Sequence, residues 1–269
     1  MIYNQNDKAA ILKGKVVAIA NQNGGVGKTT TAMNLGAALY ELGENTLLVD
    51  FDPQGTLTIA HGLDPDSLSS TIYNAFVKSD FDIREAILRS ENGADLIPAN
   101  IDLSAAEVEL LSELGRETYL KDTLKPLKDR YNFILVDCPP SLGLLTINAL
   151  VAADAVIIPV VTQYLRFRGM KLLLDTIERV KARLNPGLSP PRILPTMFQT
   201  RTIHSREVLD EIRNTFGSQV FPTVIRHTVR LAEAPIGGKS ILKFDSASTH
   251  AAAYRQLAKE VKTWLSVNQ

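Results

Sequence analysis

The sequence predicts an α/β fold built around a doubly wound, mostly parallel sheet. Short apolar runs have the length of buried strands, helix-like segments separate them, and a glycine-rich turn joins the first run to the first helical pattern. Continuous apolar strands alternating with helices are typical of a parallel sheet that helices cover on both faces. The expected strands cover residues 16–20, 46–50, 94–98, 132–137, 155–161, 192–197 and 219–225, and the clearest helical patterns cover 167–184, 203–216 and 248–266.

The glycine-rich turn follows the first expected strand and opens the first helix, which is the context of a phosphate-binding loop. Small residues let backbone N–H groups converge on phosphate oxygens, and the following helix turns its positive end toward the same anion. Lys28 can reach the terminal phosphates, and the Thr29 hydroxyl can ligate Mg²⁺. The expected phosphate-binding residues are Gly24, Gly25, Val26, Gly27, Lys28, Thr29 and Thr30.

Three carboxylates stand at the ends of expected strands, where open parallel sheets bind their ligands. Asp137 follows four apolar residues and has the position of an acid that holds Mg²⁺ through water. Asp50 and Asp52 flank Phe51, so in an extended chain they point the same way. One of the two could orient the attacking water, and the other could support the metal. We therefore expect a metal site at Thr29, Asp50, Asp52 and Asp137, and catalysis by Lys28, Asp52 and Asp137.

Length and composition favour one large domain over residues 15–269 of the 269, after a leader at residues 1–14. A single cysteine, Cys138, excludes an internal disulfide and fits a reducing cytoplasm. The net charge is zero, but residues 1–160 carry −9 and residues 161–269 carry +9. This asymmetry predicts a basic surface for nucleic acid in the second part, although solvated helix faces would give the same count.

Four motifs together resemble one family. These are the phosphate-binding loop, Val-Asp-Phe-Asp-Pro-Gln-Gly at 49–55, Asp-Cys-Pro-Pro-Ser at 137–141 with Leu-Thr-Ile-Asn-Ala-Leu at 145–150, and Val-Arg-Leu-Ala-Glu-Ala-Pro at 229–235. In this order, over about residues 15–265, they resemble the ParA/Soj partition ATPases. These belong to the ParA/MinD-type P-loop NTPases, whose phosphate loop is called a deviant Walker A.

The resemblance implies that the protein is an ATPase with ATP and Mg²⁺ as cofactors. It also implies a homodimer that closes face to face around two nucleotides, binds DNA without sequence preference and is stimulated by a small adaptor of ParB/McdB type. Asp52 matches an acid whose loss blocks hydrolysis, and Arg201 and Arg230 match arginines that contact the DNA backbone. Met197 and Arg226 match positions beside the nucleotide. The implied location is cytoplasmic and nucleoid-associated.

One departure narrows the resemblance. The family carries a signature lysine at the start of the loop, where this chain has Asn23. The McdA branch, which positions carboxysomes, lacks that lysine and supplies another from later in the chain. Lys171 is the expected substitute here, with Arg166 and Arg168 as alternatives. We therefore favour an McdA-like function and keep plasmid or chromosome partition as the alternative.

A membrane-associated switch like MinD is a further alternative. An apolar stripe on the last expected helix would serve as its anchor. Packing of that stripe in the core is the stronger expectation, because a stripe of this width is normal for any surface helix. The stripe consists of Tyr254, Leu257, Ala258, Val261, Trp264 and Leu265.

Overall fold

The computed structural model describes residues 14–77, 80–162 and 167–267. Its described residues form a six-stranded parallel sheet in the order β3-β2-β4-β1-β5-β6. The strands are β1 (Lys15–Ile19), β2 (Thr46–Asp50), β3 (Asp95–Ile97), β4 (Phe133–Asp137), β5 (Ala155–Val161) and β6 (Arg192–Thr196). The predicted α/β fold with a doubly wound parallel sheet is therefore confirmed.

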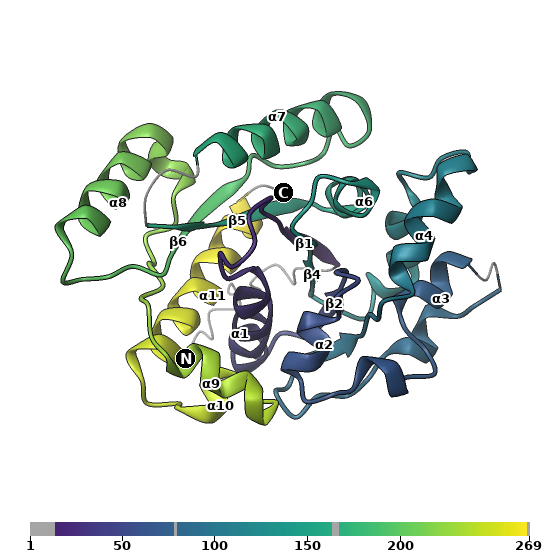
Figure 1. Ribbon diagram of the computed structural model, residues 1–269, viewed down its shortest axis with the longest axis horizontal. Coiled ribbons are helices and arrows are strands. Elements are labelled where there is room, and N and C mark those ends of the chain that lie inside the picture. The colour runs from purple at the N-terminus through teal and green to yellow at the C-terminus, as the bar shows by residue number, and fades with distance from the viewer. Residues whose placement is uncertain (1–13, 78–79, 163–166, 268–269) are drawn as a thin grey trace, which may run out of the picture.

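Helices cover both faces of the sheet, and the alternation of side chains along β1 shows why (Figure 1). Val17 and Ile19 pack with α1 (Lys28–Glu41) and α11 (Thr249–Val267). Val16 and Ala18 pack in a second cluster with α6 (Leu144–Ala152) and α7 (Phe167–Arg183). Because both faces are buried, the interiors of the strands are apolar at successive positions rather than at every second one, and the polar residues stand at the strand ends.

The remaining α-helices lie in the connections from β2 to β3 and from β3 to β4, and in the chain between β6 and α11. They are α2 (Thr56–Ala60), α3 (Ile72–Val77), α4 (Leu103–Glu109), α5 (Tyr119–Leu124), α8 (Ile203–Phe216), α9 (Arg230–Glu233) and α10 (Ile241–Phe244). In Figure 1, α3 and α4 lie on one side of the molecule and α8 on the other, with α1 between them. The strand register sets Asp137 beside both Ile19 and Asp50, so the loops that follow β1, β2 and β4 meet at one edge.

One expected strand is wrong. Residues 219–225 form no named strand, although they run beside β6. Val220 makes an isolated bridge to Ile193, and the Phe221 N–H donates to the Ile193 carbonyl at 2.9 Å. Pro222 has no N–H, so the ladder cannot continue there. The other six strands and the three helical patterns lie where the sequence predicts, within one or two residues.

The apolar stripe of α11 is buried in the core, as its pattern indicates. Phe221 packs edge-on against Trp264 with ring centroids 5.7 Å apart. Among the described residues, no helix combines the length and the apolar character that crossing a membrane requires. Apart from Gly14, the predicted leader at residues 1–14 lies outside the described residues, so its separation from a domain at 15–269 stays a prediction.

Candidate nucleotide-binding site

The glycine-rich loop leaves an open space above its backbone. Gly25 and Gly27 have φ angles of 68° and 89°, in the region that glycine adopts without strain. A Cβ atom built on Gly24, Gly25 or Gly27 would meet no atom within 4 Å. The loop is therefore a cradle whose backbone a ligand can approach closely, as a chain of phosphates requires.

Neighbouring strands hold this loop from below. The Asn21 side chain accepts the Asn23 N–H at 2.9 Å and donates to the Pro159 carbonyl on β5 at 2.7 Å. On β6, the Thr196 hydroxyl donates to the Val26 carbonyl at 2.9 Å. Pro159 and Thr196 lie more than 130 positions along the chain from the residues that they bond, so the sheet itself shapes the loop.

Lys28 is folded back over the loop that it follows. Its ammonium donates to the Asn23 carbonyl at 3.2 Å, and the residue is 7% exposed. Burial lowers the pKa of Lys28, while the nearby Asp137 carboxylate acts in the opposite direction. The side chain is thus a positioned cation at the mouth of the phosphate cradle.

Asp137 ends β4 as a buried carboxylate without a partner. It is 1% exposed, and within the described part of the chain neither oxygen makes a hydrogen bond. Burial raises the pKa of Asp137 well above its ordinary value, and Asp50 adds to the rise. The Thr29 hydroxyl and Lys28 favour the charged form, although Thr29 does not reach hydrogen-bond geometry. An orphaned carboxylate facing a hydroxyl is a donor set that suits Mg²⁺.

Asp50 is engaged by the protein itself. One carboxylate oxygen accepts the Thr58 N–H at 2.8 Å and the Thr58 hydroxyl at 2.7 Å, and the other accepts the Asp52 N–H at 3.2 Å. Burial raises the pKa of Asp50 to about 6. These bonds make Asp50 a support for the turn that carries Asp52. Asp52 remains partly exposed at the same edge, with one carboxylate oxygen accepting the Gln54 N–H at 3.0 Å.

A cavity of about 170 Å³ adjoins the loop. Met197 lines it with φ at 53°, an uncommon angle for a residue with a side chain and one that often marks a functional site. Arg226, also expected near the nucleotide, is exposed and does not line this cavity. The cavity borders the loop at Gly27 and Thr30, and its other walls are Thr196, Met197, Ile225, His227, Thr228, Leu231, Ala232 and Tyr254.

His227 and Tyr254 are among the wall residues that the sequence does not predict at the nucleotide. Tyr254 is expected only as part of the buried stripe of the last helix. The position of His227 in the turn before the 229–235 motif was the available signal. Tyr254 had none, because only the tertiary fold brings α11 to the loop.

The basic residues that the sequence predicts at the nucleotide and at DNA lie on different elements. The first turn of α7 touches position 23, because a Cβ on Gly169 would lie 3.2 Å from the Asn23 amide nitrogen. Lys171 is exposed two residues further along α7. Arg166 and the side chain of Arg168 lie outside the described residues. Of the arginines expected at DNA, Arg201 is exposed before α8, and Arg230 begins α9, where it forms an ion pair with Asp245 at 2.6 Å.

The parallel sheet, the glycine-rich loop and the carboxylates beside it define a nucleotide-binding α/β protein of the P-loop class. Comparison with known proteins agrees, since residues 14–189 match a family described as AAA domain. The chain is 46% identical over 251 residues to the chromosome-partitioning ATPase Soj of Treponema pallidum, covering 92% of this chain and 97% of that protein. It is 42% identical over 262 residues to the chromosome partitioning protein ParA of Myxococcus xanthus, covering 97% and 92%. The chain belongs to this ParA/Soj family of ATPases.

Solved structures support the same assignment. A cobyrinic acid a,c-diamide synthase from Mycobacterium smegmatis, with bound ATP analog and magnesium, is 40% identical with a TM-score of 0.83, covering 94% of this chain and 96% of that one. The expected cofactors, ATP and Mg²⁺, are thus those of a close structural neighbour. McdA from Cyanothece has a TM-score of 0.80 at 24% identity, covering 91% of this chain and 98% of that one, and this likeness concerns the fold.

Proposed function

We propose that this protein is a partition-type ATPase that dimerises around two ATP molecules, binds DNA without sequence preference and positions a cargo through partner-stimulated hydrolysis. The observation that carries the proposal is the unpartnered, buried Asp137 carboxylate beside Lys28 and an open phosphate cradle. Keeping a carboxylate buried and unpaired costs stability, so its presence supports a site where the Mg²⁺ of a bound nucleotide would satisfy it.

Each residue has a distinct task in this proposal. The loop N–H groups and the Lys28 ammonium bind the phosphates and stabilise the charge that develops as the bond to the γ-phosphate breaks. Thr29 and Asp137 hold Mg²⁺, which supplies further charge neutralisation when bound. Asp52 orients the attacking water, and Asp50 holds the Asp52 turn by accepting the N–H groups of Asp52 and Thr58.

The proposal also concerns the cargo, which is either DNA or an organelle. The absence of the signature lysine at Asn23 favours an organelle cargo, as in McdA. The identity of 46% with Soj, against 24% with McdA, favours a chromosome or plasmid. We propose DNA as the cargo on this difference, and an McdA-like carboxysome cargo remains the second candidate because of Asn23.

A pair of variants tests the ATPase cycle. We expect Lys28→Ala to abolish ATP binding, because it removes the main cation facing the β and γ phosphates. Asp52→Ala should keep ATP binding, stop turnover and accumulate as a DNA-bound dimer. Calorimetry, phosphate release and DNA gel shifts measure these three steps. An Asp52→Ala protein that turns over ATP at the normal rate contradicts the proposed role.

Lys171 is the proposed replacement for the missing lysine. The contact between α7 and Asn23 supports this choice, because Lys171 projects from the same end of the helix. Lys171→Ala should fold as a monomer but lose ATP-dependent dimerisation, and adding Asn23→Lys should restore part of it. Light scattering with ATP measures both. Normal dimerisation of Lys171→Ala assigns the task to another residue or to none.

A further inference from the structure

One stretch of the chain forms a wall of the cavity that adjoins the phosphate loop. Thr228, Leu231 and Ala232 line this cavity, and Thr30 of α1 lines it as well. We name residues 228–241 the wall segment, which runs through α9 to the first residue of α10. The place of the wall segment relative to α1 therefore sets the width of the cavity.

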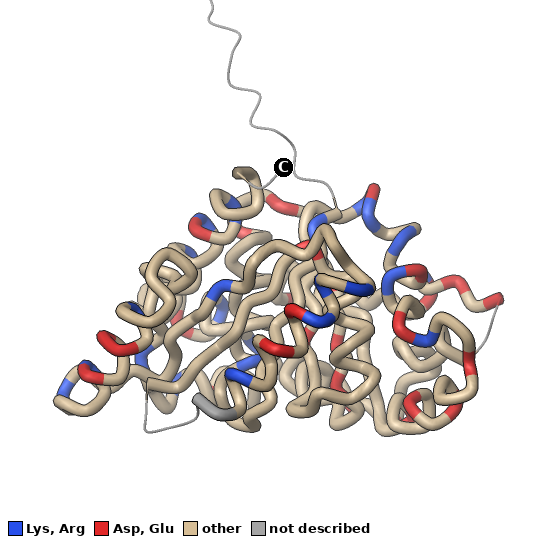
Figure 2. The backbone as a smooth tube through the Cα atoms, turned by 90° about the horizontal axis from the view of Figure 1, so that it is seen from above, with Lys and Arg blue, Asp and Glu red and all other residues tan. Residues whose placement is uncertain are grey.

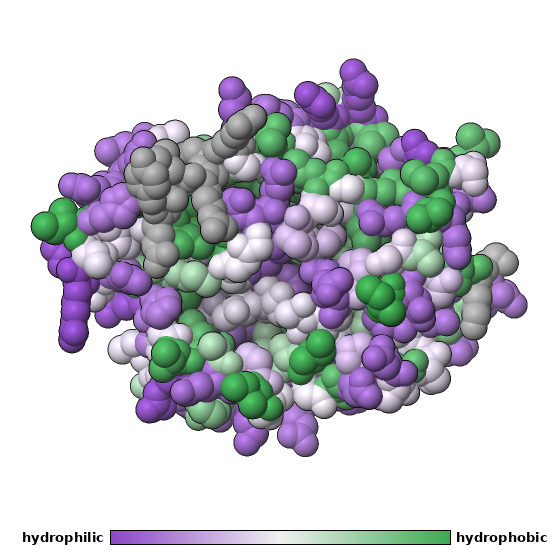
Figure 3. Space-filling view, in the orientation of Figure 1, coloured by the Kyte–Doolittle hydropathy of each residue, from purple (hydrophilic) through white to green (hydrophobic). Residues whose placement is uncertain are grey.

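Packing in the core holds little of the wall segment. Of residues 228–239, only Ala234 is buried. Figure 3 shows hydrophobic residues at the surface over α9 and α10, and Val229 and Ile236 are 65% and 86% exposed. Apolar side chains that stay in water contribute little to packing, so the position of the wall segment depends on the hydrogen bonds at its end.

Asn34 of α1 holds the end of the wall segment. Its side chain donates to the Thr30 carbonyl at 2.7 Å and accepts the Ile241 N–H at 2.6 Å. The first bond fixes the amide on its own helix, and the second reaches a residue 207 positions away along the chain. Asn34 is 2% exposed, so water does not compete for these bonds. The amide therefore sets the distance between the first turn of α1 and the start of α10.

Asn34 also acts in place of an N-cap for α10. Ser240 precedes this helix, but its hydroxyl makes no cap hydrogen bond and is buried without a partner within the described part of the chain. The first N–H of α10 is bonded by Asn34 instead. Because Ile241 is fully buried, loss of the Asn34 amide would leave this N–H unsatisfied in the interior.

Two further contacts fix the same end of the wall segment. Asn92 donates to the Gly238 carbonyl at 2.9 Å and accepts the Ser240 N–H at 2.7 Å. Gly238, with φ at 67°, lies against Gly62 after α2, and a Cβ on Gly238 would come within 3.2 Å of the Gly62 Cα. Of these contacts, the one made by Asn34 joins the wall segment to the helix that begins in the phosphate loop.

We propose that Asn34 positions the wall segment for the nucleoside part of ATP, and that it acts on the affinity for ATP but not on the affinity for the phosphates alone. The loop N–H groups and the Lys28 ammonium bind the phosphates, and Asn34 bonds to none of these groups. The cavity holds the sugar and base, and Asn34 is bonded to the segment that forms one of its walls. The inference rests on the proposed binding of ATP at this loop.

Asn148 provides a matched control, because it makes the same pair of bonds in another helix. It donates to the Leu144 carbonyl in α6 at 3.1 Å and accepts the Leu120 N–H at 3.1 Å, with a further bond to the Arg116 carbonyl at 2.8 Å. Its loss thus removes at least as many hydrogen bonds as the loss of Asn34.

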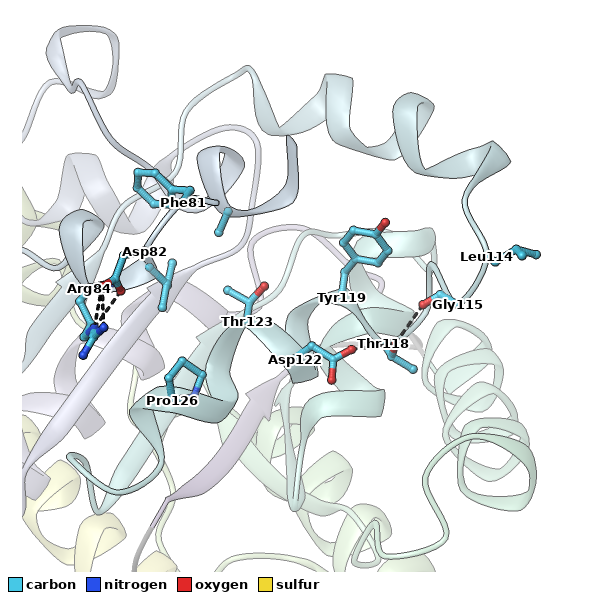
Figure 4. Close-up of a pocket in the computed structure, with 12 residues that line it drawn as sticks. Phe81, Asp82, Arg84, Leu114, Gly115, Thr118, Tyr119, Asp122, Thr123 and Pro126 are labelled. Atoms are coloured by element: carbon cyan, nitrogen blue, oxygen red, sulfur yellow. Dashed lines mark hydrogen bonds and ion pairs between the residues drawn. The ribbon is translucent and has the colours of Figure 1, made fainter. Parts of the chain in front are cut away.

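The surroundings of Asn148 are separate from the cavity. Figure 4 shows Tyr119, the residue before Leu120, at a groove of about 470 Å³ that shares no lining residue with the cavity beside the loop. A residue of α3 also lines this groove, on the side of the molecule where acidic and basic positions are mixed (Figure 2). Replacement of Asn148 therefore makes the same chemical change outside the nucleotide site.

Calorimetry on the full chain measures the Kd of ATP and the Kd of inorganic tripolyphosphate, both with Mg²⁺. Asn34→Ala should raise the Kd of ATP about tenfold or more and leave that of tripolyphosphate within about twofold of the wild type. Asn148→Ala should keep the wild-type ratio of the two Kd values. Asn92→Ala loosens the same end of the wall segment without a change in α1, so it should shift the ratio in the same direction. It is the test variant if Asn34→Ala does not fold.

Three outcomes overturn the proposal. They are an equal rise of both Kd values in Asn34→Ala, an unchanged Kd of ATP in Asn34→Ala and Asn92→Ala, and a shift of the ratio in Asn148→Ala as large as that in Asn34→Ala. These outcomes leave the proposed ATPase cycle intact. A wild-type chain that binds neither ligand overturns the proposed function, and the task of Asn34 with it.

Discussion

At the scale of single residues, Asp50 and Asp137 are both buried carboxylates, but only Asp50 is hydrogen-bonded by the protein. Thr58 and the Asp52 backbone satisfy Asp50, which makes it part of the framework. Asp137 has no such partner among the described residues, so folding buries its carboxylate without the hydrogen bonds that satisfy Asp50. Function and stability therefore conflict at Asp137, as is common at active sites.

We expect Asp137→Asn to stabilise the nucleotide-free protein at neutral pH by about 1–3 kcal/mol, because it replaces a buried carboxylate that has no hydrogen-bond partner by a neutral side chain of the same size. The pKa of Asp137 is raised above 3.8 in the folded state, so the folded protein binds the proton more tightly than the unfolded chain does. The contribution of Asp137 to stability is therefore present at low pH and is lost as the pH rises. Urea unfolding at pH 4.5 and 7.5 should show the gain of Asp137→Asn growing with pH. A variant less stable than the wild type at pH 7.5 contradicts this account.

At the scale of elements, β6 matters because it supports the phosphate loop through one hydroxyl. Thr196→Val removes the hydrogen bond to the Val26 carbonyl, which is worth about 1 kcal/mol, so the Kd for ATP should rise about fivefold. Thr162→Val is the matched control, because Thr162 is buried nearby but bonds to Thr196 and Ser205 rather than to the loop. Calorimetric titration with ATP measures both, and equal losses assign the effect to general destabilisation.

The elements also mark what could be predicted from the sequence. Strand positions and the phosphate loop follow from local patterns, because periodicity and glycine placement act over a few residues. The pairing of Asp50 with Thr58 and the approach of Tyr254 to the cavity depend on side-chain packing that no local pattern encodes. The absence of a named strand at 219–225 was readable from Pro222, which the apolar run around it outweighed.

At the scale of the whole molecule, the charge asymmetry divides the chain into an acidic and a basic part. Residues 80–122 alone hold eleven acidic and four basic side chains of the acidic part. In the basic part, Arg230 forms an ion pair with Asp245, and the Arg230 side chain remains 55% exposed. An exposed pair of this kind is weak, so a phosphate can replace the aspartate.

We expect Arg201→Ala and Arg230→Ala each to weaken DNA binding for all sequences and to lower the slope of log affinity against log salt by about 1. Asp245→Asn should raise DNA affinity, because it releases Arg230 from its pair. Fluorescence anisotropy at several salt concentrations measures both effects. Changed sequence preference in the arginine variants, or unchanged affinity in Asp245→Asn, contradicts this assignment.

The central position of β1 in the sheet has a consequence for how the chain is made. Lys15 pairs with Phe133, 118 residues later, and Val17 pairs with Ala155 on the other side. During synthesis at about 5–20 residues per second, both edges of β1 stay unpaired for several seconds or more. The strand that leads into the phosphate loop is thus the apolar segment that waits longest for its partners during synthesis, when it can associate with other chains. Slow translation between residues 20 and 155 would lengthen this wait.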